Sequence, residues 1–231
     1  MKAKILNSLL LLLPVLAFIG CNTDDDYYYY YPDPNVSLGM IANASPDSGD
    51  LFFYADANSI NSTALNYPNA AGYYNFYLGD RTFSIQDASG NELATVDKTL
   101  EAGTFFSVFA VNTFANIELV VYDDVLEYPS TADKSMVRFI NLSPDAPAIG
   151  VSLQENELAS GIEFKQATDF IEIDSGTHTL TFTNTDGEVL YTYADVNFTP
   201  KSIYTIYTKG YVTPPDGSND SFSTRRIRNW N

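Results

Sequence analysis

Hydrophobic and polar residues alternate in short runs along most of the chain. In residues 178–183 the order His-Thr-Leu-Thr-Phe-Thr places Leu and Phe on one side of an extended strand. The run turns at Asp186-Gly187 and then resumes, which is the pattern of a β-hairpin. Such runs are rich in Val, Ile, Phe, Tyr and Thr, and almost none has helical periodicity. The sequence therefore predicts an all-β protein.

The pattern is duplicated within the chain. The segment NASPDSGDLFFYA begins at Asn43 and NLSPDAPAIGVSL begins at Asn141, an offset of 141 − 43 = 98 residues. The segments TFFSVFA and SIYTIYT begin at Thr104 and Ser202 and have the same offset, 202 − 104 = 98. Three matching patches in the same order, with DASGNEL and NTDGEVL between these two, indicate two copies of one domain.

Two copies are too few for a solenoid, so each copy must have its own hydrophobic core. Copies of about 90 residues with closely spaced strands predict two tandem antiparallel β-sandwiches of the immunoglobulin-like or transthyretin-like type. We place the first sandwich at residues 38–128, a linker at 129–133 and the second sandwich at 134–231. The segments IELVVYDD and FSTRRIRNW are the predicted closing strands of the two copies.

Positions that are apolar in both copies predict the core-facing side of each strand, because side chains alternate between the two faces. They comprise Leu51, Phe53 and Ala55, matched by Ile149, Val151 and Leu153, and Tyr74 and Phe76, matched by Ile171 and Ile173.

The first copy has additional aromatic residues on the opposite, outward side of its strands. Phe52, Tyr54, Tyr73 and Tyr77 stand where the second copy has Gly150, Ser152, Phe170 and Asp174. Phe105 and Phe109 flank a polar serine on a further strand. Because clustered exposed aromatic groups are typical of contact surfaces, we predict a binding or docking face for a glycan, a peptide or another envelope protein. The alternative is that these residues pack against the second copy or beneath the loop at 57–72.

Residues 1–20 have the pattern of a secretory signal peptide, with Lys2 and Lys4 before an apolar run that ends in front of Cys21. The segment AFIGC resembles the lipobox of bacterial lipoproteins, although Phe18 stands where Leu is commoner. The resemblance implies that Cys21 is diacylated and becomes the mature N-terminus. Two acyl chains are enough for stable attachment to a membrane. An ordinary secretory signal with an incidental cysteine is the alternative.

Residues 21–37 predict a tether. Three aspartates at 24–26 precede five tyrosines at 27–31 and two prolines, with no strand or helix periodicity. The acidic triplet resembles the export tag that directs some Gram-negative lipoproteins to the outer surface. We therefore predict a lipid-anchored outer-membrane protein displayed on the cell surface, with a periplasm-facing protein as the alternative.

The charge of the chain limits the classes of molecule that it can bind. It has 29 acidic and 12 basic side chains, and removal of residues 1–20 takes away two lysines, so the net charge becomes 10 − 29 = −19. Such a surface repels nucleic-acid phosphates and anionic lipid headgroups. Nucleic acid is excluded as a partner, and membrane contact is expected from the N-terminal lipid alone.

Catalytic motifs are missing from the sequence. His178 is the one histidine and lies in an alternating strand, and an acylated cysteine leaves no Cys–His pair. Neither Gly-x-Ser-x-Gly nor Gly-x-x-x-x-Gly-Lys occurs. We expect no enzyme activity, no cofactor and no metal. A calcium site is a weaker alternative to simple turns at two places in the sequence. The side chains with oxygen atoms that could bind calcium there are Asp216, Asn219 and Asp220, and the pair Asp123-Asp124.

Within the second copy, the segments MVRFINLSPDAPAIGVSL, ELASGIEFKQATDFIEIDSGTHTLTF and SIYTIYTKG resemble a bacterial extracytoplasmic family of domains of unknown function. The hallmark of that family is the opening strand VRxxNxSPDAP. The first copy keeps Asn-x-Ser-Pro-Asp but has Ser48 and Gly49 where Ala-Pro is usual. The resemblance implies a β-sandwich outside the cytoplasm and brings no activity. We expect the Ser-Pro-Asp steps at 45–47 and 143–145 to form strand-ending turns.

Together these patterns predict a non-enzymatic lipoprotein of the cell envelope that acts in recognition or adhesion. A structural or assembly subunit of an envelope complex is the first alternative. A hydrolase is the weaker second alternative, because its usual motifs are missing.

Overall fold

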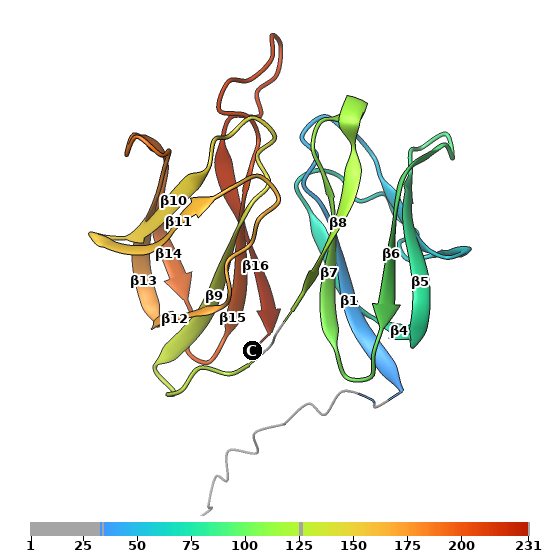
Figure 1. The fold of residues 1–231 in the computed structure, drawn as a ribbon, viewed down its shortest axis with the longest axis horizontal. Helices are drawn as coiled ribbons and strands as arrows, with labels where there is room; N and C mark the ends of the chain where they lie inside the picture. The colour runs from blue at the N-terminus through green and yellow to red at the C-terminus, as the bar shows by residue number, and fades with distance from the viewer. Residues whose placement is uncertain (1–32, 34, 125–126, 231) are drawn as a thin grey trace, which may run out of the picture. The chain divides into compact units, whose positions relative to one another are not determined.

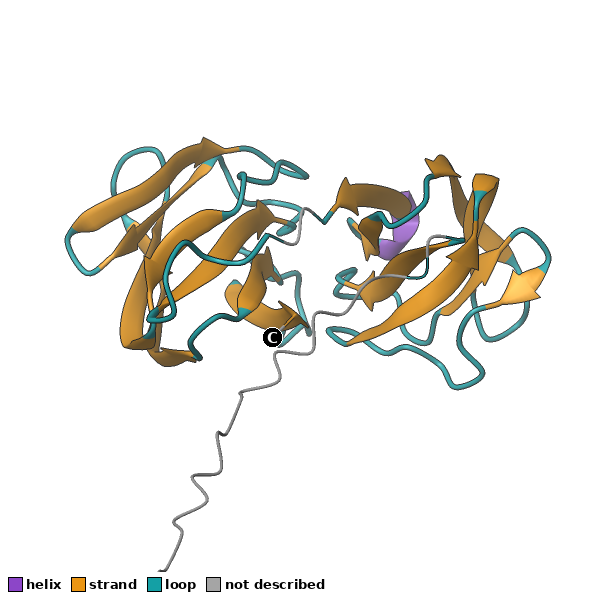
Figure 2. Cartoon of the chain, turned by 90° about the horizontal axis from the view of Figure 1, so that it is seen from below, coloured by secondary structure: helices purple, strands orange, loops and turns teal. Residues whose placement is uncertain are grey.

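A computed structural model describes residues 33, 35–124 and 127–230 (Figure 1). The signal peptide, Cys21, the acidic triplet and the tyrosine run all lie outside the described residues. Within the described ranges the regular structure is β-strand apart from one short 3₁₀ helix, Phe114–Asn116 (Figure 2). This part of the chain has no helix with the length and apolar character needed to cross a membrane.

The first sandwich consists of two four-stranded sheets with the strand orders β4-β1-β7-β8 and β3-β2-β5-β6. Its central strand β1 pairs antiparallel with β4 and parallel with β7. The strands are β1 (Val36–Asn43), β2 (Phe52–Ala55), β3 (Asn58–Ser59), β4 (Ala70–Tyr77), β5 (Gly79–Gln86), β6 (Glu92–Leu100), β7 (Phe105–Val111) and β8 (Glu118–Asp123).

The second sandwich repeats this topology, with the strand orders β12-β9-β15-β16 and β11-β10-β13-β14. Again its first strand, β9, pairs in parallel with β15. The strands are β9 (Lys134–Asn141), β10 (Ile149–Leu153), β11 (Asn156–Ile162), β12 (Ile171–Asp174), β13 (Gly176–Thr183), β14 (Val189–Phe198), β15 (Ile203–Lys209) and β16 (Ser223–Trp230).

The predicted all-β fold of two tandem sandwiches is confirmed, including the hairpin, which is β13–β14, and both closing strands, which are β8 and β16. The parallel pairing of β1 with β7 and of β9 with β15 differs from the predicted antiparallel sheets. Parallel neighbours need a long connection, and here the whole second sheet of each sandwich lies between them in sequence.

Each sandwich has its own apolar core. The predicted core residues Leu51 and Phe53 are fully buried in the first, and Ile149 and Val151 are buried in the second. In the first core, Phe106 packs its ring at 5.4 Å from the ring of Phe83, in an edge-on arrangement. Two inward sets of strand residues therefore build two cores, as the duplication predicted.

Asn43 and Asn141, the first residues of the repeated Asn-x-Ser-Pro-Asp motif, are fully buried and fix the end of the opening strand. Asn43 Nδ2 donates to Leu65 O at 3.0 Å, and its Oδ1 accepts the Ser45 backbone N–H at 3.1 Å. Asn141 makes the equivalent bond to Ile162 O at 3.1 Å. The amide thus satisfies backbone groups that the end of the strand leaves open.

The aspartate of the motif ties the turn to the loop after the parallel strand. Asp47 Oδ1 accepts the Phe114 N–H at 2.7 Å, and Asp145 accepts the N–H groups of Val212 and Thr213, each at 2.8 Å. Both Ser-Pro-Asp steps are turns that follow a strand, which confirms the expectation from sequence.

The outward faces of two sheets, β4-β1-β7-β8 and β12-β9-β15-β16, contribute to one shared apolar cluster. Phe109, which the sequence placed on an exposed face, is fully buried there, 5.4 Å from the ring of Tyr207. Phe109 therefore follows the alternative stated from sequence, in which outward aromatic residues pack against the second copy. The buried members of the cluster are Ala42, Ala44, Phe109, Val111, Ile140, Leu142 and Tyr207.

A closed ring of polar side chains lies beside this cluster. Arg138 forms an ion pair with Asp124, and both side chains are buried, being 3% and 0% exposed. The Nε of Arg138 donates to Thr205 Oγ1 at 3.0 Å. Thr205 donates to Asn229 Oδ1 at 2.8 Å, and Asn229 Nδ2 donates to Tyr73 Oη at 2.9 Å. Tyr73 closes the ring by donating to Asp124 Oδ2 at 2.6 Å. We call these five residues the polar ring.

Equivalent strands of the two copies form the polar ring, but each of its two charged residues is present in only one copy. Strand register makes Asp124 of the first copy equivalent to Asn229 of the second. The offset of 98 residues makes Met40 equivalent to Arg138. One copy therefore supplies the carboxylate and the other supplies the guanidinium, and each has a neutral residue at the matching position.

Replacement of either charged member by its neutral counterpart tests this pairing. We expect Arg138→Met and Asp124→Asn each to lower the free energy of unfolding by about 3–5 kcal/mol, because each leaves one buried charge unpaired. The double variant should lose clearly less than the sum of the two. Urea unfolding of the four proteins measures the coupling. Lys134→Met, at the solvent-accessible Lys134–Asp174 pair, is the control and should change stability little. Additive losses would contradict the pairing.

Three tyrosines of the same region predict a loss of stability in alkali. Burial raises the pKa of Tyr73, Tyr122 and Tyr207 above the usual range, and the carboxylate of Asp124 adds to the effect at Tyr73. The folded protein therefore keeps protons that the unfolded chain loses above about pH 10. The free energy of unfolding should be unaffected by these groups below pH 9 and fall above pH 10 by about 1.4 kcal/mol per pH unit for each tyrosine.

Urea unfolding at pH 9, 10 and 11 measures this decrease. Tyr207→Phe removes one titrating group, together with the bond from Tyr207 Oη to Pro68 O at 3.0 Å, so it should be less stable at pH 9 and have a shallower slope. An unchanged slope in the variant would show that Tyr207 ionises freely in the folded state.

Candidate recognition site

The four outward aromatic residues that sequence grouped together lie on two different sheets. Phe52 and Tyr54 are on β2, in the sheet β3-β2-β5-β6, and Tyr73 and Tyr77 are on β4, in the sheet β4-β1-β7-β8. The outward faces of the two sheets of a sandwich point away from each other. The four residues therefore do not form one face, and the prediction that they do is wrong.

Tyr73 and Tyr77 have different surroundings although they share a strand. Tyr73 belongs to the polar ring, and its aromatic ring contacts that of Phe105 edge-on at 5.8 Å between centroids. Tyr77 is 81% exposed. Tyr73 thus has a structural role, whereas Tyr77 presents an aromatic ring to solvent.

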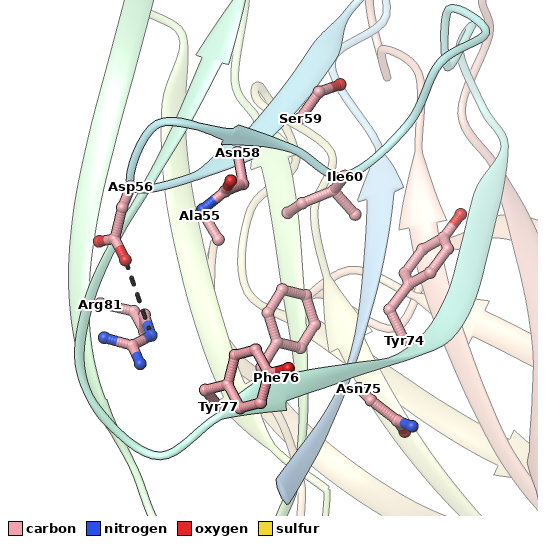
Figure 3. A pocket seen from close by; sticks show the side chains of 10 residues that line it. All are labelled: Ala55, Asp56, Asn58, Ser59, Ile60, Tyr74, Asn75, Phe76, Tyr77 and Arg81. Atoms are coloured by element: carbon pink, nitrogen blue, oxygen red, sulfur yellow. Dashed lines mark ion pairs between the residues drawn. The ribbon is translucent and has the colours of Figure 1, made fainter.

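Tyr77 borders a groove of about 330 Å³ at the open edge of the first sandwich (Figure 3). One rim is β4, and the other is formed by β2, β3 and the residues that follow them. We call this feature the β3–β4 groove. The residues that line it are Ala55, Asp56, Asn58, Ser59, Ile60, Tyr74, Asn75, Phe76, Tyr77 and Arg81.

The groove exists where both sheets end in an edge strand. β3 has only two residues, whereas the equivalent strand of the second copy, β11, has seven. The chain after β3 is held by the buried Asn61, whose Oδ1 accepts the Phe53 N–H at 2.6 Å and whose Nδ2 donates to Leu51 O at 3.1 Å. A short strand followed by an anchored loop therefore leaves this edge open.

The floor of the groove is apolar and its mouth is aromatic. Phe76 is buried in the first core, and Tyr74 and Ile60 pack against that core. In Figure 3 the side chains of Tyr74, Phe76 and Tyr77 extend from β4, and Ile60 and Asn58 come from the opposite rim. The groove thus offers a flat aromatic surface above an apolar base.

Asp56 and Arg81 form a fixed pair of charges at one end of the groove. Arg81 Nε lies 3.6 Å from Asp56 Oδ2, and Asp56 Oδ1 accepts the Thr82 N–H at 3.0 Å. The two other nitrogens of Arg81 donate to Asp80 O and Leu78 O at 2.8 and 2.9 Å. The two charges cancel, and hydrogen bonds to the backbone hold both in place before any ligand arrives.

Several polar groups of the groove have no partner within the described part of the chain. No hydrogen bond from a described residue reaches the side-chain amides of Asn58 and Asn75, or the hydroxyls of Tyr74 and Tyr77. Each amide supplies both a donor and an acceptor. These groups are available to a bound molecule.

The second copy has charged residues at the positions of Tyr77 and Asn75. Asp174 replaces Tyr77 and pairs with Lys134 Nζ at 2.6 Å. Glu172 replaces Asn75 and accepts the Ser130 N–H at 2.6 Å. The exposed aromatic ring and the free amide are therefore specific to the first copy.

Sequence reasoning identified Tyr77 and missed Asp56, Asn58, Ile60 and Arg81. These four belong to other strands and loops, and only the stacking of two sheets brings them beside β4. The signal that was available is the exchange of Tyr77 for a charged residue in the other copy.

The carboxylates proposed as calcium ligands at Asp123-Asp124 both contact cations of the protein. Asp123 lies 2.6 Å from Lys98 Nζ, and Asp124 pairs with Arg138. His178 lies on β13, and its Nε2 contacts Asp174 O at 2.9 Å. Among the described residues, no three or more His, Cys, Asp or Glu side chains lie together in a way that could hold a metal ion.

The sequence matches the model of a domain of unknown function, DUF4397, over residues 40–152 and 135–225. The two matches cover most of the chain and both copies, so the chain belongs to this family. Comparison with curated proteins found no match.

Solved structures with similar chains are distant. One is the CBMbc module (family CBM26) of Eubacterium rectale Amy13K in complex with maltoheptaose, at 14% identity and a TM-score of 0.28, with 78% of this chain and 98% of that chain covered. Two proteins provisionally assigned to cell adhesion, from Bacteroides uniformis and Bacteroides ovatus, have 10% and 12% identity and TM-scores of 0.26 and 0.27. For both, 86% of this chain is covered, with 99% and 98% of theirs. At these TM-scores the functional conclusion depends on the residues of this chain alone.

Proposed function

We propose that this protein is a non-enzymatic lipoprotein of the cell envelope, displayed on the cell surface, whose first sandwich recognises a partner. The observation that carries the proposal is the β3–β4 groove, where the exposed ring of Tyr77 lies among polar groups with fixed or free hydrogen-bonding capacity. The Cys21 motif supports attachment to a membrane, and the acidic triplet at 24–26 supports display on the cell surface.

The packing of the two sandwiches supports a role for the second copy as a rigid base. The apolar cluster and the polar ring both contain residues of the two copies. Tyr122 of the first copy also donates to Lys165 O of the second at 2.9 Å. Apolar contacts and hydrogen bonds thus both join the second copy to the sandwich that contains the groove.

The lining of the groove supports recognition in preference to catalysis. It contains one carboxylate, Asp56, which already accepts a backbone N–H and pairs with Arg81. Hydrolysis of glycosidic bonds commonly uses two carboxyl groups with separate roles. A bound molecule would be held by this lining without an acid and base to cleave it.

Attachment and display are tested by changing Cys21 and the acidic triplet in intact cells. Wild-type protein should incorporate labelled palmitate, fractionate with the outer membrane and be cleaved by proteinase K added to whole cells. Cys21→Ser should lose the label and leave the membrane fraction. Replacement of all three aspartates at 24–26 by Asn should keep the label and reduce cleavage on intact cells by at least fivefold.

A soluble periplasmic protein of equal size serves as the control for cell integrity and should resist the protease. Cleavage of the wild-type protein only after the cells are permeabilised would contradict surface display. Retention of the label by Cys21→Ser would contradict the lipid site.

A further inference from the structure

We propose that the β3–β4 groove binds a neutral carbohydrate, with one sugar ring stacked on Tyr77; this rests on the proposed function and names its ligand class. The groove has a volume of about 330 Å³, which lies at the lower end of the range for small-molecule sites. It is also open at the edge of the sandwich, so a sugar within a longer chain could enter without its neighbours meeting the protein core.

The aromatic ring at the mouth suits one face of a sugar. A pyranose ring has a face of C–H groups, which carry small positive charges, and the face of an aromatic ring carries negative charge density. Tyr77 is 81% exposed, so its ring is available for stacking. Tyr74, half-buried on the same strand, extends the aromatic surface into the groove.

The polar groups suit the edge of the same sugar. Each sugar hydroxyl both donates and accepts, which matches the amide of Asn58, and Asp56 adds an acceptor of fixed orientation. A purely apolar ligand would cover the Asn58 amide and the Asp56–Arg81 pair without replacing their bonds to water, which is unfavourable for each group. The lining therefore favours a ligand rich in hydroxyls.

Charge selects a neutral sugar over an acidic one. The single carboxylate and the single guanidinium of the groove are paired with each other. The full chain has a net charge of −17, and −19 without residues 1–20, which repels polyanions such as uronic-acid polymers. No unpaired cation among the lining residues is available to reverse that repulsion.

Binding is tested with the whole protein, purified in a zwitterionic detergent that has no sugar headgroup. The probes are cellohexaose, maltohexaose and mannohexaose as neutral oligosaccharides, and hexagalacturonate as the anionic comparison, observed by saturation-transfer NMR and calorimetry. We expect at least one neutral probe to bind and hexagalacturonate to bind at least tenfold more weakly.

Three substitutions locate the site. Tyr77→Asp, which installs the residue of the second copy, should weaken binding at least tenfold, whereas Tyr77→Trp should retain it. Tyr54→Ser also installs the second-copy residue, lies on the other sheet and should leave binding unchanged. Because Tyr77 is exposed, the melting temperature of Tyr77→Asp should match the wild type within about 2 °C.

Equal binding by Tyr77→Asp and wild type, stronger binding of hexagalacturonate, or no binding of any probe would overturn the carbohydrate assignment. If the probes fail while intact cells still expose the protein to proteinase K and a crosslinker inserted at Tyr77 captures an envelope protein, the proposed function stands and this inference falls. If the protein is also inaccessible on intact cells, the proposed function fails as well.

Discussion

The buried ion pair between Asp124 and Arg138 is the interaction on which the arrangement of the two copies depends. Each charge is removed from water and has its main opposite charge in the other copy. A buried ion pair gains little over a neutral pair of similar shape, but the loss of one partner is costly. The pair therefore acts mainly against separation and against alternative packings, while Phe109, Tyr207 and the rest of the apolar cluster supply the buried area.

The two copies share one fold but differ in sequence at two of their surfaces. At the joined faces the two copies are complementary. The first copy has the charged Asp124 where the second has the neutral Asn229, and the second copy has the charged Arg138 where the first has Met40. At the open edge they became unlike, since Tyr77 is exposed and its counterpart pairs with a lysine. The proposed division, with support from one copy and recognition by the other, rests on these two differences.

Strands, cores and the hairpin could be predicted from sequence because alternation along a strand is a local property, as at Phe53 and Val151. Exposure could not be predicted in the same way. Alternation places Phe109 on the outward face, and only the position of the other copy decides that this face is buried. The groove has a similar origin, because Arg81 and Tyr77 belong to different sheets that meet at an edge. Asp124 resembled a loop ligand because its partner lies in the other copy.

The place of β1 in its sheet gives the proposed N-terminal tether a mechanical consequence. The first strand after the tether is hydrogen-bonded along both of its edges, to β4 on one side and to β7 on the other. Tension applied along the tether would therefore pull on two ladders of bonds in parallel, in shear, and many bonds would have to break together. A strand at the edge of the sheet would instead peel away bond by bond at much lower force. The pairing of β1 along both edges therefore suits the attachment proposed above, in which any load on the tether reaches the first sandwich through β1.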